Sequence, residues 1–142
     1  MSDALIGWGA MVEFHNGTSL IELQEVVSFP LPDDEADDVE VTHLKSAGKR
    51  REYISGLIDG GTVDVELNYV PGSATDALIR AQKALGLVRT IVFTIPDGDT
   101  GWEITTSAFI KGYARGPIEA GGKLNSVVRF RITGAQTEAA AA

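Results

Sequence analysis

Apolar and polar residues alternate along most of the chain, which predicts a protein built mainly from β-strands. The clearest segment is 62–70, "TVDVELNYV", where valine, leucine and tyrosine occupy every second position. Because successive side chains of a strand point to opposite faces, one face is apolar and the other carries Asp64, Glu66 and Asn68. The same reasoning predicts strands over residues 8–15, 19–31, 39–44, 89–95, 101–114 and 125–134.

One segment, at about residues 74–86, has the periodicity of a helix. Ser73 is a suitable N-cap, with Asp76 near the positive end of the helix dipole, and Gly86 is a suitable terminator. The predicted apolar stripe consists of Leu78, Ile79, Ala81 and Leu85. Many strands and one helix predict a mainly β fold, a β-sandwich or barrel with one flanking helix. We expect a single domain over residues 1–134 and a short flexible tail over residues 135–142.

Three segments are predicted to be loops or turns. The first is an acidic run that cannot be buried and that contains Asp33, Asp34, Glu35, Asp37, Asp38 and Glu40. The second is a long, exposed, glycine-rich loop over about residues 43–61, with the basic residues Lys45, Lys49, Arg50 and Arg51. Loops of this length are usually functional or disordered. The third, "PDGDTG" at residues 96–101, is predicted to be a β-turn.

Charge and composition narrow the classes of function. The 142 residues include 20 acidic and 12 basic side chains, which gives a formal net charge of −8, whereas a DNA-binding protein presents a basic face. The chain has no cysteine, so disulfides and thiolate metal sites are excluded. Neither a secretory signal nor a run of roughly 20 apolar residues is present. We therefore expect assembly in a cytoplasm and no contact with a membrane.

One short motif suggests an enzyme, but its details exclude that reading. The stretch "ISGLIDGG" at residues 54–61 is similar to LAGLIDADG, the signature of a class of homing endonucleases. When the two are aligned, Asp59 takes the first acidic position, but the metal-binding acid falls on Gly61, which has no side chain. The adjacent Gly60 and Gly61 would also end the helix that the motif requires. We predict no catalytic residue, no metal site and no cofactor.

Three groups of residues follow one another between the acidic run and the helix, namely Thr42, Leu44 and Ser46, then Glu52, Gly56, Leu57, Asp59 and Gly61, then Asn68, Tyr69 and Pro71. This order of short motifs resembles the tail-tube proteins of lambda-like long-tailed bacteriophages. The later segments "IPDGDTGWEITTSAFIKGYARG" and "SVVRFRITG" also resemble the C-terminal strands of that family. The resemblance spans residues 26–134.

The resemblance implies a structural virion protein whose copies form hexameric rings stacked into a tail tube. The implied partners are further copies of the chain and the tape-measure, tail-terminator and distal tail proteins, while DNA passes through the lumen without specific binding. Asp64, Glu66 and Asn68 are then candidates to face an acidic lumen. The long loop is expected to reach a neighbouring subunit, through Lys45, Lys49, Arg50, Arg51, Glu52, Tyr53, Gly56, Leu57, Ile58 and Asp59.

Two alternatives remain open at the level of sequence. A related tube protein of a contractile tail or of a type VI secretion system is one, and a monomeric ligand-binding β-sandwich is the other. In the tube, we expect the cluster of Lys49, Arg50 and Arg51 to pair with acids of the adjacent ring.

Overall fold

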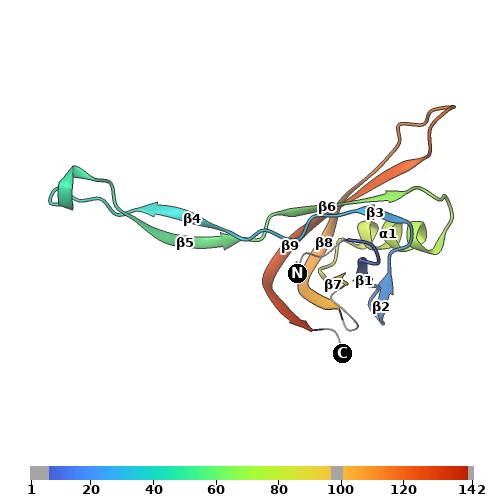
Figure 1. The fold of residues 1–142 in the computed structure, drawn as a ribbon, viewed down its shortest axis with the longest axis horizontal. Coiled ribbons are helices and arrows are strands. Elements are labelled where there is room, and N and C mark those ends of the chain that lie inside the picture. The colour runs from blue at the N-terminus through green and yellow to red at the C-terminus, as the bar shows by residue number, and fades with distance from the viewer. Residues whose placement is uncertain (1–6, 97–100, 141–142) are drawn as a thin grey trace, which may run out of the picture.

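The structure, a computed structural model, describes residues 7–96 and 101–140 of the chain and places its strands in two sheets (Figure 1). The larger sheet has seven strands in the order β2-β1-β7-β8-β9-β6-β3, and the smaller one pairs β4 with β5. The strands are β1 (Met11–His15), β2 (Leu20–Glu22), β3 (Val26–Ser28), β4 (Glu35–Glu40), β5 (Tyr53–Asp59), β6 (Thr62–Asn68), β7 (Arg89–Ile95), β8 (Trp102–Arg115) and β9 (Asn125–Ala140). Every pairing in both sheets is antiparallel.

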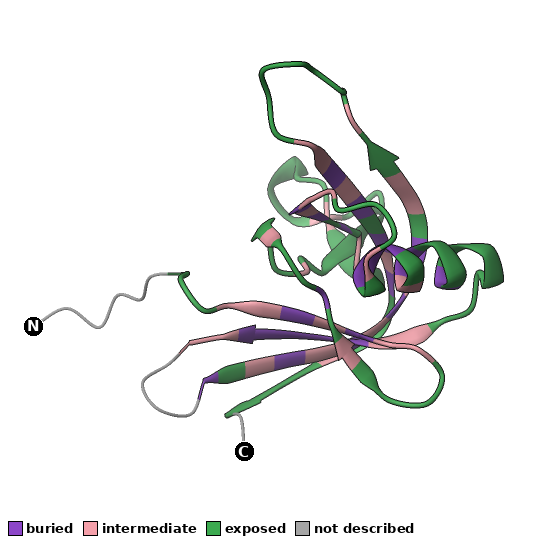
Figure 2. Ribbon diagram, turned by 90° about the vertical axis from the view of Figure 1, so that its right-hand side faces the viewer, coloured by how far each residue is buried: buried purple, intermediate pink, exposed green. Residues whose placement is uncertain are grey.

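The seven-stranded sheet is strongly curled. Phe14 on β1 and Phe130 on β9 have ring centroids 5.1 Å apart, although β7 and β8 lie between their strands. A flat sheet would separate those strands by roughly 14 Å, since neighbouring strands lie about 4.8 Å apart. The two edge strands, β2 and β3, are also joined by only residues 23–25. The sheet is therefore a half-barrel whose concave side holds the core; Figure 2 shows the strands folding toward the helix.

The core consists of the inward side chains of this sheet, as the alternation predicts. Val63, Val65 and Leu67 of β6 are buried, and so are Val128, Phe130 and Ile132 of the adjacent β9. A mainly β fold with one flanking helix is thus confirmed. Instead of two separate layers, a single curled sheet encloses the core.

Helix α1 (Ala74–Leu85) covers the concave side, and its two ends follow the predicted capping. The N–H of Asp76 donates to the Ser73 hydroxyl at 3.2 Å, and Gly86 ends the helix with a φ of 65°. The predicted apolar stripe is partly wrong. The buried face carries Thr75, Asp76, Ile79 and Gln82, Leu78 is half-buried, and Leu85 is 56% exposed.

Buried polar contacts explain why the helix turns this face inward. Asp76, only 3% exposed, accepts hydrogen bonds from the Tyr113 hydroxyl at 3.0 Å, the Gly72 N–H at 3.1 Å and Arg80 Nε at 3.0 Å. Burial acts to raise the pKa of Asp76, but these bonds and the Arg80 charge outweigh it and hold the pKa below its usual value. Burial and the bond to Asp76 raise the pKa of Tyr113 to about 12. The fully hydrogen-bonded carboxylate of Asp76 therefore holds the helix against β8.

Three predictions about irregular segments are wrong, that for the long loop only in part. The acidic run and part of the long loop form strands β4 and β5, because the backbone of residues 35–40 bonds to that of residues 53–59. The segment 135–140 extends β9 beside β8 and is not a loose tail. Most of the predicted turn at 96–101 lies outside the described residues.

Candidate functional site

A two-stranded arm projects from the body of the protein (Figure 1). We define the arm as strands β4 and β5 with the connecting residues 41–52, of which 47–49 form a short 3-10 turn. All of β4 is exposed, and in β5 only Gly56 is half-buried. An isolated two-stranded ribbon is marginally stable in water, so the arm is an element that needs a partner.

One face of the arm is an exposed apolar strip. Val39 lies opposite Ile54, and Ala36 lies opposite Ile58, so these four side chains share a face. Gly56 lies between the two isoleucines, and a Cβ at this position would meet a Val39 methyl group at 2.8 Å. Ile54 and Ile58 are 56% and 70% exposed. A strip of this kind on a ribbon without a covering layer is typical of a protein interface.

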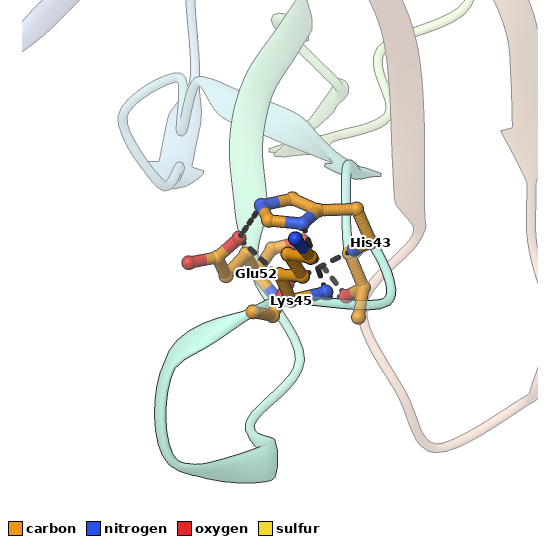
Figure 3. A network of polar contacts seen from close by, with 5 residues as sticks. His43, Lys45 and Glu52 are labelled. Carbon is orange, nitrogen blue, oxygen red and sulfur yellow. Dashed lines mark hydrogen bonds and ion pairs between the residues drawn. The ribbon is translucent and has the colours of Figure 1, made fainter.

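The tip of the arm, residues 41–52, is closed by its own hydrogen bonds (Figure 3). Glu52 N–H donates to Thr42 Oγ1 at 2.7 Å, and the Ser46 hydroxyl donates to the Glu52 carboxylate at 2.9 Å. His43 Nε2 lies 3.6 Å from the same carboxylate, while Nδ1 accepts the Lys45 N–H at 3.2 Å. Both the backbone N–H and the carboxylate of Glu52 therefore have partners within the tip, where the two sides of the loop meet.

This arrangement leaves four basic side chains exposed at the tip, namely Lys45, Lys49, Arg50 and Arg51. Within the described residues, none of the four forms an ion pair. The structure therefore gathers the predicted basic residues into one patch.

The acidic residues lie on the other part of the arm. We call residues 33–40 the acidic stem; its exposed carboxylates belong to Asp33, Asp34, Glu35, Asp37, Asp38 and Glu40. In the described part of the chain these carboxylates have no basic partner within 4 Å. The arm therefore has a basic tip and an acidic strand that leads to it.

The base of the arm is tied to the body through Asp59. Its Oδ1 accepts the Gly61 N–H at 2.9 Å and Arg131 Nη2 at 2.7 Å. The bond from Gly61, followed by that from Arg131, lowers the pKa of Asp59. Gly60 packs against Ile132, so closely that an added Cβ would lie 2.7 Å from its methyl group. Asp59 and Gly60 thus act at the joint, and Tyr53 and Leu57 lie farther out, both exposed.

The face of the large sheet opposite the core, here called the polar face, carries the three predicted lumen candidates. Asp64 lies opposite Arg129 on β9, with Oδ1 and Nε 3.8 Å apart. Glu66 accepts a hydrogen bond from the Ser28 hydroxyl at 3.4 Å, and Asn68 donates to Glu25 at 3.3 Å. The arginine beside Asp64 reduces the negative potential of this part of the face.

A stronger acidic group lies farther along the same face and was not selected from the sequence. Glu13 on β1 lies directly opposite Glu22 on β2, and the charge of Glu103 on β8 also acts on Glu13. Burial, then the charges of Glu103 and Glu22, raise the pKa of Glu13. The alternation Val12, Glu13, Phe14 contained a signal for the direction of Glu13, but the sequence does not reveal which strands are neighbours.

Other site types find no support in the residues that the structure describes. No group of three or more histidine or carboxylate side chains there is arranged to hold a metal ion. Among the helices of the described ranges, none is long and apolar enough to cross a bilayer. The two features that call for a partner are the arm and the polar face.

Comparison with known proteins shows which family the chain matches. Residues 12–139 match the family described as "Lambda phage tail tube protein, TTP". No curated protein matches the chain in sequence.

Three similar solved structures establish the fold. The tail of an empty gene transfer agent particle, refined with C6 symmetry, has a TM-score of 0.77 at 18% identity and covers 94% of this chain and 98% of that one. The sheath-tube complex of an extracellular contractile injection system gives 0.71 at 12%, with 96% and 92% covered. The SPP1 tail tube gives 0.63 at 13%, with 96% and 80% covered.

Proposed function

We propose, because the chain belongs to the lambda phage tail tube protein family, that its copies form closed rings that stack into a tube. The protein is a structural subunit of a phage-like tail tube and not an enzyme. Six copies per ring is the number we propose, by analogy with the sixfold gene transfer agent tail.

The observation that carries the proposal is the unpartnered arm. A two-stranded ribbon with Ile54 and Ile58 exposed on one face gains little stability from its own chain. Covering the four apolar side chains of its strip with a neighbouring copy would supply the missing burial. At roughly 25 cal/mol per Å², each 100 Å² of apolar surface covered contributes about 2.5 kcal/mol before the cost of association.

The polar face is the surface that we assign to the lumen. Asp64, Glu66 and Asn68 lie on it, and Glu13, Glu22 and Glu103 add the larger share of unneutralised negative charge. Phosphates are repelled by such a surface, so a DNA strand would slide along it without binding. We propose that this surface conducts DNA during ejection.

The remaining partners of the tube follow from its ends and its contents. A stacked tube presents one unpaired ring at each end, and we propose that terminator and distal tail proteins cover these rings. A tape-measure protein would occupy the lumen before DNA does. The subunit would then be part of the virion and assemble in the bacterial host.

Electron microscopy of the purified chain at increasing concentration tests this function. The expected result is uniform rings or tubes with sixfold symmetry in end-on views. The matched lumen test changes Glu22 and Glu103 to lysine, which should leave the tubes intact but make them retain added DNA. Monomers at every concentration, or a variant tube that ignores DNA as the parent does, would contradict the corresponding part of the proposal.

A tube of a contractile apparatus is the second candidate, because the contractile injection system structure shares the fold over nearly all of both chains. Such a tube is surrounded by a sheath. Copurification of the tubes with a sheath protein from the native particle would favour this candidate, and bare tubes would favour the non-contractile tail.

A further inference from the structure

We infer that the basic tip of one arm binds the acidic stem of the arm of another copy, so that each arm is both ligand and receptor. This inference deepens the proposed function, since it names the surface that the tip recognises. The tip and the stem carry opposite charges. The tip offers Lys45, Lys49, Arg50 and Arg51, and the stem offers six carboxylates, all exposed.

Most of the stem lies too far from the tip of the same chain to be neutralised by it. Strands β4 and β5 are extended and paired (Figure 1). Glu40, at the end of β4, adjoins the tip, whereas Asp33 and Asp34 lie at the base of the arm. At about 3.3 Å per residue, Asp34 and Lys45 are separated by roughly 30 Å along the ribbon. The Debye length at physiological salt is only about 8 Å. The tip therefore cannot neutralise the carboxylates at the base of the stem, which keep their charge until a second molecule meets them.

The tip is also preorganised to present its charges. Glu52, the one carboxylate among residues 43–52, is held at the neck of the loop by Ser46 and faces His43 (Figure 3). Gly48 and Lys49 both have positive φ, 63° and 57°, which folds the tip into a compact turn. Because these bonds exist in the free chain, less ordering is needed when the tip meets an acidic surface.

Among acidic surfaces of a second copy, the stem is the best match. Asp64 and Asp59 on the body already face Arg129 and Arg131, at 3.8 and 2.7 Å. The cluster around Glu13 lies on the polar face, which copies in a ring would turn toward the lumen. Among the residues that the structure describes, the stem alone combines unpaired carboxylates with an adjacent apolar strip, that of Val39, Ile54 and Ile58. A tip that docks there pairs its charges and covers apolar surface at the same time.

A contact of this kind allows copies to be added one after another, with no fixed number of copies in the assembly. The tip and the stem are different surfaces, so the contact is heterologous, and each bound copy presents a new tip and a new stem. Successive rings could be joined in this way. Because both patches are exposed, the contact should weaken as salt rises from about 0.1 M to about 1 M and the Debye length falls from about 10 to about 3 Å.

A charge exchange tests the inference. The tip variant changes Lys49, Arg50 and Arg51 to glutamate, and the stem variant changes Asp34, Asp37 and Asp38 to lysine. All six side chains are exposed and make no ion pair among the described residues, so both variants should fold, as circular dichroism will verify. The control changes Lys83, Lys111 and Lys123 to glutamate, which alters net charge as much as the tip variant does but on the body of the protein.

Sedimentation and electron microscopy then read the assembly of each variant alone and of the two in an equimolar mixture. We expect loss of assembly for each variant alone, restored assembly in the mixture, and parental assembly for the control. Assembly of either variant alone, or failure of the mixture to associate, would overturn the inference. If the mixture associates but neither it nor the parent forms rings or tubes, the tip–stem contact stands and the proposed tube function fails.

Discussion

The contact between Phe14 and Phe130 should stabilise the curled sheet by an amount that a double-mutant cycle can measure. Both rings are buried, and their centroids lie 5.1 Å apart at an angle of 46°. Changing either residue to leucine keeps an apolar side chain but leaves a small cavity, at a cost of about 1–2 kcal/mol each. Aromatic pairs of this geometry add about 0.5–1.5 kcal/mol beyond their burial. The double variant should therefore lose less stability than the sum of the two single losses, by that amount.

Urea unfolding of the four proteins, at a concentration where sedimentation shows monomer, gives the coupling energy. A coupling of about 1 kcal/mol corresponds to roughly a fivefold change in the folding equilibrium constant, which such curves resolve. As a control, Phe14→Leu combined with Ile54→Ser in the projecting arm should be additive within about 0.5 kcal/mol. A coupling between Phe14 and Phe130 no larger than this control would refute the reasoning, because the strands would then not approach each other across the concave side.

Two further predictions concern carboxylates of the body. Glu13→Gln should raise the free energy of unfolding at pH 7 by about 0.2–1 kcal/mol, since it removes a charge that is partly buried and repelled by Glu103 and Glu22. The pKa of Glu13 is raised in the folded state, so its charged form destabilises the fold above that pKa and the effect disappears as pH falls below the unfolded pKa. Thermal melting should therefore find the gain reduced near pH 4, and an equal gain at both pH values would contradict the prediction. Asp76→Asn should cost about 1–3 kcal/mol at pH 7, because an amide oxygen that keeps the Tyr113 hydrogen bond leaves its NH2 group facing two donors, the Gly72 N–H and Arg80 Nε, and the charge beside Arg80 is lost. Urea unfolding measures the loss, and an unchanged midpoint would contradict it. The pKa of Asp76 is lowered in the folded state, so its stabilising effect is fully present above the unfolded pKa of about 3.9 and is lost as pH falls through the folded pKa. The parent should therefore lose stability over that acidic range more steeply than Asp76→Asn.

Local patterns in the sequence were sufficient for much of the body. The alternation at Val63, Val65 and Leu67 is a strand buried on one face, and each residue points as the period of two requires. Ser73 and Gly86 end the helix as their capping chemistry indicates. These signals are readable because they depend on residues only a few positions apart.

The same patterns failed where a strand has no buried face. Residues 35–40 are exposed on both sides, so their side chains carry no alternation, and the six carboxylates within residues 33–40 predict a loop. They form a strand because their backbone groups bond to those of residues 53–59, a pairing set by register across a loop. Local periodicity also could not give the helix face, which Asp76 fixes through its bond to Tyr113, 37 positions away in the chain.

The sequence by itself determined that this chain is mainly β, with one helix, a segregated basic segment and a segregated acidic segment, and an order of motifs typical of tail tubes. Only the tertiary structure decided that the acidic and basic segments belong to one projecting arm, and that the charges of Glu22 and Glu103 act on Glu13 at the polar face. The physical reason is that alternation specifies which way a side chain points, whereas neighbours across a sheet are chosen by hydrogen bonds and packing between distant parts of the chain.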